Sequence, residues 1–261
     1  MPKVKRLFWD IESLPNIGYF WQSGWRINIP PENIIQERQL CCIGYKWEGK
    51  KAQCLTWDGK SDKQLVIDFC KIAREADELV AHNGDKFDLK WLNTRCLVHG
   101  VELPEAKTID TLVIARRRFR FNSNKLDYLA KYLLGEGKIH TSFDLWVDVC
   151  NGDDKALRKM VDYCKKDVVL LERVWQQIQK FHKPKSHQGV FLKRDNWTCP
   201  ECGSQDVKTN KTITTTAGSK RFEMLCKDCR RYYRISNAVH NKYNAWYLRG
   251  NTPNQDEVIN G

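Results

Sequence analysis

Acidic residues that could bind a divalent cation occur in three separate segments of this 261-residue chain. The first pair, Asp10 and Glu12, lies two residues apart at the end of a strand-like run. Period-two alternation puts both side chains on one face of a sheet, where two carboxylates can reach one metal ion. Asp-x-Glu is also common by chance, and an exposed acidic strand end would explain it without any metal.

The second segment ends at Asp88, in the run His-Asn-Gly-Asp-Lys-Phe-Asp. We expect a strand that stops at the Gly turn, Phe87 packed inward, and the Asp88 carboxylate at the start of the next helix. The helix dipole favours an acidic residue at such a position without any further function. Asp85 competes for the same role, but it lies within the turn.

The third segment is a helical run in which Tyr163 and Asp167 are four residues apart and therefore share a face. A solvated amphipathic face would explain the lysines at 165 and 166 between them. It explains less well a Tyr and an Asp that lie beside the apolar Val168.

The three segments together resemble the three exonuclease motifs of the DEDD superfamily. The residues that carry this likeness are Phe8-Trp9-Asp10-Ile11-Glu12, Asn83-Gly84-Asp85-Lys86-Phe87-Asp88 and Tyr163-Cys164-Lys165-Lys166-Asp167. The match is nearest to the proofreading domains of family-B DNA polymerases and their free-standing relatives. Asp110-Thr111-Leu112 and the stretch from Leu126 to Gly135 also resemble the segment between the second and third motifs there. The resemblance covers about residues 4–181.

The resemblance implies a role for each motif residue. Asp10, Glu12, Asp88 and Asp167 match the four metal-binding carboxylates, with Asp10 bridging two ions and Asp88 acting through water. Tyr163 matches the residue that defines the tyrosine subclass, and it would orient the attacking water. Two Mg²⁺ or Mn²⁺ ions about 4 Å apart can clamp a scissile phosphate. With an ordinary pKa near 10, Tyr163 is a poor general base at neutral pH.

The elements around these motifs predict an α/β, ribonuclease H-like fold, a mixed five-stranded sheet flanked by helices. Strands are expected at Val4–Ile11, Leu40–Trp47, Ala52–Trp57, Glu78–Ala81 and Thr108–Leu112. Helices are expected from an N-cap at Ser61 to Ala76, over Lys86–His99 closed by Gly100, over Leu126–Leu134, and over Asp153–Phe181.

Two further segments could contact a nucleic acid. The aromatic stretch of residues 14–31 holds Tyr19, Phe20, Trp21 and Trp25, which we expect to pack as a lobe over the sheet. Alternatively, one of these rings stacks on the terminal bases near the metals. The basic run Arg116, Arg117 and Arg118 could follow a phosphate backbone, and a plain solvated helix end explains it nearly as well.

The C-terminal part of the chain carries a second metal-binding signal. Cys199-Pro-Glu-Cys202 and Cys226-Lys-Asp-Cys229 are two Cys-x-x-Cys pairs separated by 23 residues. This spacing predicts a zinc ribbon, a small β module in which four thiolates hold one structural Zn²⁺. Two disulfides are the alternative, but seven other scattered cysteines favour a reducing, intracellular compartment.

The ribbon is rich in basic and aromatic residues that suit phosphate contacts and base stacking. The candidate nucleic-acid-binding residues are Arg230, Arg231, Tyr232, Tyr233 and Arg234. A small β module also needs aromatic rings for its own core, so protein docking and pure stability stay open as roles for this module.

Composition supports a globular protein with a polyanionic partner. The net charge of +12 favours nucleic acid, and no apolar run is long enough to cross a membrane. We expect an exonuclease domain over 1–182, a linker over 183–196, a zinc-ribbon nucleic-acid-binding module over 197–250, and a tail over 251–261.

The leading hypothesis is a cytoplasmic 3′→5′ exonuclease that releases nucleoside 5′-monophosphates from DNA in replication or repair, with a replication protein as a conceivable partner. A compact free-standing core of this kind is compatible with a gene of a bacterial virus. The rival hypotheses are an RNA exonuclease or structure-specific nuclease on the same core, a nucleic-acid-binding scaffold with a vestigial site, and a zinc-ribbon accessory factor.

Overall fold

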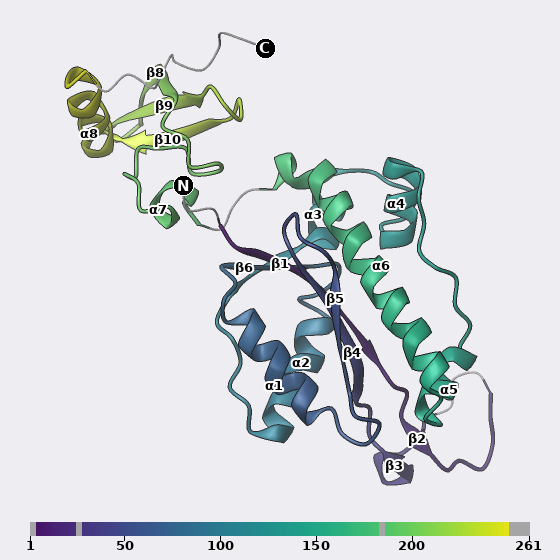
Figure 1. Cartoon of the computed structure of the whole chain (residues 1–261). Coiled ribbons are helices and arrows are strands. Elements are labelled where there is room, and N and C mark those ends of the chain that lie inside the picture. The colour runs from purple at the N-terminus through teal and green to yellow at the C-terminus, as the bar shows by residue number, and fades with distance from the viewer. Residues whose placement is uncertain (1–3, 25–27, 183–185, 251–261) are drawn as a thin grey trace. The chain divides into compact units, whose positions relative to one another are not determined.

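The structure is a computed structural model that describes residues 4–24, 28–182 and 186–250. The chain forms two compact units, of which one is Lys5–His182 and the other follows residue 182 (Figure 1). In these described ranges no helix is both long and apolar enough to cross a membrane.

The larger unit is built on a mixed five-stranded sheet, as expected from the sequence. Its strand order is β5-β4-β1-β6-β7, which places β1 at the centre. β1 pairs antiparallel with β4 and parallel with β6, and the two edge pairs are antiparallel β4–β5 and parallel β6–β7. The strands are β1 Arg6–Ser13, β4 Leu40–Trp47, β5 Gln53–Thr56, β6 Glu78–Ala81 and β7 Lys107–Asp110.

Helices cover both faces of this sheet, with α1 and α2 on one side and the long α6 on the other (Figure 1). The helices of this unit are α1 Lys63–Ala73, α2 Asp88–His99, α3 Thr111–Arg118, α4 Leu126–Leu134, α5 Asp144–Cys150 and α6 Asp154–Ile178, followed by the 3-10 turn Gln179–Phe181. Gly100 and Gly135 close α2 and α4 in the left-handed conformation, which glycine adopts without steric penalty. Asp153 caps α6 by accepting the N–H groups of the first turn.

The alternation of β1 divides the core between the two layers of helices. Trp9 stacks on Phe69 of α1, with ring centroids 5.0 Å apart. Phe8 points the other way and packs with Leu171 and Val174 of α6. Because side chains alternate along a strand, the side chains of Asp10 and Glu12 share the α6 side of the sheet with Phe8.

The start of α1 differs from the expectation. Asp62, rather than Ser61, precedes the first helical residue, and it makes no side-chain cap. Its buried carboxylate instead accepts hydrogen bonds from both Nε and Nη2 of Arg95, each at 2.7 Å. The backbone N–H of Leu40 donates to the same carboxylate at 2.9 Å. A tertiary ion pair therefore occupies the Asp62 side chain, while Ser61 accepts the N–H of Lys63 at 3.2 Å. The helix ends at Ala73 rather than at residue 76.

The expected strand over residues 108–112 stops early. Asp110 ends β7 and caps α3 by accepting the N–H groups of Leu112 and Val113. This capping bond starts a helix at Thr111, so the Thr-Leu pair belongs to α3 rather than to the strand.

In residues 14–24 and 28–36, which the structure describes after β1, the regular elements are short: a two-stranded sheet of β2 Ile17–Gly18 and β3 Ile34–Gln36 and the 3-10 turn Pro31–Asn33. Tyr19 is 79% exposed and Trp21 is fully exposed, so these rings do not pack as a lobe over the sheet. Phe20 is exposed as well. Trp25 lies outside the described residues.

The smaller unit contains an antiparallel three-stranded sheet of order β10-β9-β8, with α8 packed against β9 and β10. Its core gathers around Trp197, which is fully buried and lies against Trp246 and Tyr243. The elements are α7 Gln188–Phe191, β8 Val207–Thr214, β9 Lys220–Cys226, β10 Tyr232–Ser236 and α8 Asn237–Leu248. The helix α8 was not expected from the sequence.

Part of the segment expected as a linker packs within this smaller unit. Gln188 is buried, and its backbone N–H donates to the carbonyl of Pro200 at 2.8 Å. The guanidinium of Arg194 donates to the carbonyl of Gly203 at 2.6 Å. Residues from α7 onward therefore support the loop that carries the first pair of cysteines.

Candidate active site

The strand β1 presents Asp10 and Glu12 toward α6. Asp10 pairs with Gly44 and Glu12 pairs with Cys42 of β4 in the antiparallel register. Both acidic residues are half-buried, so their carboxylates are withdrawn from bulk water without being sealed from it. This is the arrangement that the Asp-x-Glu spacing predicts.

Asp88 joins this pair through the backbone of β1. Its Oδ1 accepts a hydrogen bond from the N–H of Ile11, the residue between Asp10 and Glu12, at 3.1 Å. Asp88 is the first residue of α2 and is only 3% exposed. Phe87, expected to pack inward, is 39% exposed because it precedes the helix and faces solvent. Asp85, the competing candidate, lies in the preceding turn.

The long helix α6 adds Tyr163 and Asp167, one turn apart. Asp167 is fully buried, and its Oδ1 has no hydrogen-bond partner among the described residues. Tyr163 is half-buried, with its ring edge-on to Trp146 of α5 at 6.1 Å between centroids. A buried carboxylate oxygen without a donor needs a cation or a proton to compensate its lost hydration.

Lys138 is a site residue that the sequence reasoning missed. Its Nζ donates to Oδ2 of Asp167 at 2.5 Å and lies 5.5 Å from the ring centre of Tyr163. The backbone N–H of Lys138 donates to Asp127 of α4 at 2.8 Å, which holds the loop in place. No local signal distinguishes this lysine, because only the fold brings the loop after α4 to the face of α6.

Burial and mutual repulsion shift the acid–base behaviour of the cluster. Burial, followed by the charges of Asp88 and Asp167, holds the pKa of Asp10 well above its ordinary value. Burial and the charge of Asp10 do the same for Glu12. Burial raises the pKa of Asp88 to about 6. The pKa of Asp167 is also raised by burial, although the ammonium of Lys138 opposes that shift.

These shifts describe a pocket with more negative charge than its own residues can neutralise. Lys138 is the positive group that contacts the cluster, and burial and the neighbouring carboxylates act on its pKa in opposite directions, with a net rise. Oxygen donors of this kind, crowded and partly dehydrated, fit a hard divalent cation such as Mg²⁺ or Mn²⁺. Oδ1 of Asp167, which has no hydrogen-bond partner among the described residues, also fits a bound cation.

A groove of about 590 Å³ leads away from Lys138 along the loop before α4. Its lining combines basic and amide groups, among them Arg116, Lys125 and the Asn-Ser-Asn run at 122–124. Arg116, Arg117 and Arg118 occupy the exposed last turn of α3, so one of the three predicted arginines reaches this groove. The groove is large enough for a nucleotide-sized ligand.

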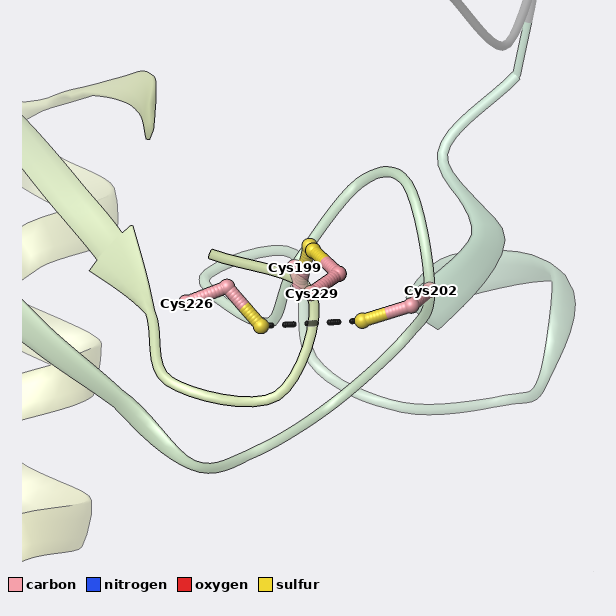
Figure 2. Close-up of side chains that lie close together, drawn as sticks. All are labelled: Cys199, Cys202, Cys226 and Cys229. Atoms are coloured by element: carbon pink, nitrogen blue, oxygen red, sulfur yellow. Dashed lines mark hydrogen bonds between the residues drawn. The ribbon is translucent and has the colours of Figure 1, made fainter. Parts of the chain in front are cut away.

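The four predicted cysteines of the smaller unit converge (Figure 2). The Sγ atoms of Cys199 and Cys229 are 3.6 Å apart, as are those of Cys202 and Cys226. Zinc bound tetrahedrally at about 2.3 Å places its sulfur ligands roughly 3.8 Å from one another. A disulfide requires sulfurs about 2.0 Å apart, and all four cysteines are free. The spacing therefore fits a tetrahedral metal site, the hallmark of a zinc ribbon.

The predicted nucleic-acid residues of the ribbon separate into two groups. Tyr233 faces the core, and its hydroxyl donates to the carbonyl of Trp197 at 2.7 Å. Arg231 forms an ion pair with Glu201. Arg230, Tyr232 and Arg234 are exposed, and Arg234 lies 3.8 Å from Glu223.

A mixed sheet of order β5-β4-β1-β6-β7 with acidic residues from its central strand and from two flanking helices defines the class of ribonuclease H-like proteins. The sequence model of the RNase_H superfamily matches residues 36–179, more than half of the chain. The chain belongs to this superfamily. The matched range does not include β1. The placement of Asp10 and Glu12 in the acidic cluster therefore comes from the structure and not from that match.

Two individual proteins are similar to parts of the chain. A segment of 53 residues is 43% identical to the DNA polymerase III PolC-type of Ureaplasma parvum serovar 3, over 20% of this chain and 4% of that protein. The family B DNA polymerase of the archaeon Pyrobaculum calidifontis shares the fold, with a TM-score of 0.53 and 16% identity over 69% of this chain and 25% of that one. The chain thus spans a small part of either relative. Family and fold, together with the acidic cluster, support a nucleic-acid hydrolase.

Proposed function

We propose that the chain is a metal-dependent 3′→5′ exonuclease that hydrolyses DNA phosphodiester bonds and releases nucleoside 5′-monophosphates. The observation that carries this proposal is the convergence of Asp10, Glu12, Asp88 and Asp167 from three elements, with the Asp88 carboxylate bound to the backbone of β1. The likeness to polymerase sequences and folds supports DNA as the substrate.

In this proposal the four carboxylates hold two Mg²⁺ or Mn²⁺ ions. When bound, such ions activate a water molecule and neutralise charge on the phosphate. Tyr163, whose pKa burial raises well above its ordinary value, stays protonated and orients the water as a hydrogen-bond partner. Lys138 lies between Asp167 and Tyr163, so its ammonium adds a fixed positive charge beside the phosphate.

The groove beside Lys138 is proposed to hold the end of the substrate strand. Arg116 and Lys125 offer positive charge to the phosphates, and the amides of Asn122 and Asn124 offer hydrogen bonds. A groove with these groups, large enough for a nucleotide, suits a single strand. Single-stranded DNA and frayed 3′ ends are therefore the proposed substrates.

The smaller unit is proposed to bind one structural Zn²⁺ through Cys199, Cys202, Cys226 and Cys229, and to contact nucleic acid through the exposed Arg230, Tyr232 and Arg234. Tyr232 is 57% exposed and is flanked by Arg234, which suits stacking on a base beside a phosphate. The DNA affinity of a Tyr232→Ala variant tests this surface. Lys242→Ala is the control, because Lys242 is an exposed basic residue on α8. Equal DNA affinity for both variants would favour protein docking or stability instead.

A time course on 5′-end-labelled single-stranded and primed DNA with Mg²⁺ tests the catalytic proposal. We expect a ladder that shortens from the 3′ end and disappears with EDTA or in the Asp10→Ala variant. Internal cuts would indicate a structure-specific nuclease, and a ladder on RNA alone would indicate an RNA exonuclease. Binding without cleavage of either substrate would indicate a scaffold with a vestigial site.

A further inference from the structure

Three cysteines outside the ribbon gather next to the carboxylates. Cys42 of β4, Cys54 of β5 and Cys164 of α6 place their Sγ atoms within 4.8 Å of one another. Cys42 and Cys164 are fully buried, whereas Cys54 is half-buried on an edge strand. The site proposed above uses none of these thiols.

Sheet register and a glycine explain why these three meet. Cys54 pairs with Gly44, and Gly44 pairs with Asp10, so a single row of the sheet joins the thiols to the acidic cluster. A Cβ at residue 44 would lie 2.8 Å from Sγ of Cys164. Because glycine has none, α6 approaches β4 closely and brings Cys164 onto the sheet.

Backbone groups contact the sulfur of Cys164. The N–H of Gly44 donates to Sγ of Cys164 at 3.1 Å, a contact that favours a negative sulfur. Buried cysteines also serve as small apolar filling. That role explains their burial, but it does not require three sulfurs to converge.

We propose that Cys42, Cys54 and Cys164 form a second soft-metal site, for a thiophilic cation such as Zn²⁺ or Cd²⁺, whose occupation inhibits the nuclease. Bonds of about 2.3 Å to three thiolates place the sulfurs roughly 3.8–4.0 Å apart, within the observed limit. Thiolates select such ions, whereas the neighbouring carboxylates select Mg²⁺, so the two sites differ in metal preference.

Cys164 links the two sites. Its sulfur also lies within 4.8 Å of ligand atoms of Asp10 and Glu12. A soft cation bound by the three thiolates lies near enough to take a carboxylate oxygen of Asp10 or Glu12 as its fourth ligand, which withdraws that oxygen from a hard cation. This inhibitory effect rests on the proposed nuclease function, whereas the binding itself does not.

The binding test is a Cd²⁺ titration of the full chain in excess Mg²⁺, followed by the ultraviolet charge-transfer absorption of thiolate-bound Cd²⁺. We expect two thiolate-bound ions per chain, one in the ribbon and one at the new site. Cys54→Ser should lose one of them, and the matched control Cys150→Ser, a half-buried cysteine outside the group, should keep both. A single ion in the wild-type chain, or an unchanged count in Cys54→Ser, would overturn the proposal. A melting curve of each variant in Mg²⁺ without Cd²⁺ shows whether that variant is folded.

The inhibition test measures DNA hydrolysis in Mg²⁺ while Cd²⁺ is added. Cys54→Ser should need at least about tenfold more Cd²⁺ for half-inhibition than the wild-type chain, which corresponds to roughly 1.4 kcal/mol of lost binding. Equal sensitivity of the two proteins would refute the inhibitory role. If the chain hydrolyses no DNA at all, the nuclease proposal fails, and the titration still decides the metal site on its own.

Discussion

Oδ1 of Asp88 accepts a hydrogen bond from the backbone N–H of Ile11 at 3.1 Å, across 77 residues of sequence. This bond fixes the first turn of α2 against the centre of β1. The Ile11 N–H lies between the two acidic residues of that strand, so the third carboxylate reaches the cluster through the backbone of that strand. The geometry leads to five predictions.

Loss of a metal-binding carboxylate should abolish hydrolysis. We expect Asp10→Ala and Asp167→Ala each to lower the rate at least about a hundredfold, since a catalytic cation contributes several kcal/mol. Tyr163→Phe should retain part of the activity, because the tyrosine orients water without accepting a proton. Steady-state rates on labelled DNA measure the series. Asp68→Asn, which removes a surface carboxylate paired with Lys71 at 3.0 Å, is the matched control, and wild-type rates in Asp10→Ala would refute the site.

Replacing Lys138 should separate metal binding from catalysis. Lys138→Met removes a positive charge that contacts Asp167, so the affinity for Mn²⁺ should rise while the rate of hydrolysis falls. Calorimetric titration with Mn²⁺ and a rate measurement give the two quantities. Lys71→Met is the control, because Lys71 is an exposed lysine of α1 that pairs with Asp68. Weaker Mn²⁺ binding in Lys138→Met would argue for a purely structural lysine.

Stabilisation by Mg²⁺ should grow as the pH rises. Burial raises the pKa of Asp88 to about 6 in the folded protein, compared with about 3.9 in an unfolded chain. Between these values the folded state binds more protons, so this group's contribution to the stability of the metal-free protein is lost as the pH increases. The cation binds the deprotonated form and reverses that loss.

The measurement is the difference in melting temperature with and without Mg²⁺, followed from about pH 5 to about pH 8. Comparing the two samples at each pH cancels the effect of the other titrating groups on the melting temperature. Asp88→Asn should flatten the rise, because its amide neither titrates nor carries charge. A difference that stays constant with pH in the wild-type chain would contradict the assignment.

Loss of a ribbon cysteine should unfold the smaller unit and spare the larger one. Cys199→Ser removes a fully buried ligand, so the chain should retain one Zn²⁺ fewer. The core around Trp197 depends on the loop that carries this cysteine, because Tyr233 bonds the Trp197 carbonyl. Limited proteolysis should then digest the part after residue 186 and leave Lys5–His182 intact. Equal protease resistance and zinc content in Cys199→Ser would exclude a structural zinc site.

Removing Asp62 should destabilise the larger unit. Arg95 donates two hydrogen bonds to this fully buried carboxylate, and Nε2 of His99 lies 2.6 Å from it. Asp62→Ala leaves the guanidinium buried without its partner, which costs about 3–5 kcal/mol. Urea unfolding measures the loss. Asp58→Ala, at an exposed turn, should cost much less, and a similarly small loss for Asp62→Ala would show that Arg95 finds another partner.

The elements of the fold were predictable where local patterns decide them. All five sheet strands follow apolar or alternating runs within two residues of their observed ends, and α4 matches its predicted limits. The β7 strand was predicted too long because the Asp110 cap, a short-range bond to its own neighbours, starts a helix at Thr111. The start of α1 was predicted one residue early, because Asp62, whose buried carboxylate binds a distant arginine, occupies the N-cap position next to Ser61.

The sequence by itself determined which residues can carry the chemistry. The two-residue spacing of Asp10 and Glu12 and the four-residue spacing of Tyr163 and Asp167 follow from the periods of a strand and a helix, and the cysteine pairs follow from the reach of a short loop. These relations are local, so they can be derived from the sequence alone.

Only the tertiary structure decided which distant groups join them. Lys138 meets Asp167 across 29 residues, and Cys164 meets Gly44 across 120. Such contacts depend on how an entire helix sits on the sheet, and no nearby residue records that placement. The exposure of Tyr232 and the burial of Tyr233 likewise depend on which face of the ribbon sheet packs on its core. Long-range packing therefore determines the charge balance and the metal chemistry of the site, and local periodicity supplies its carboxylates.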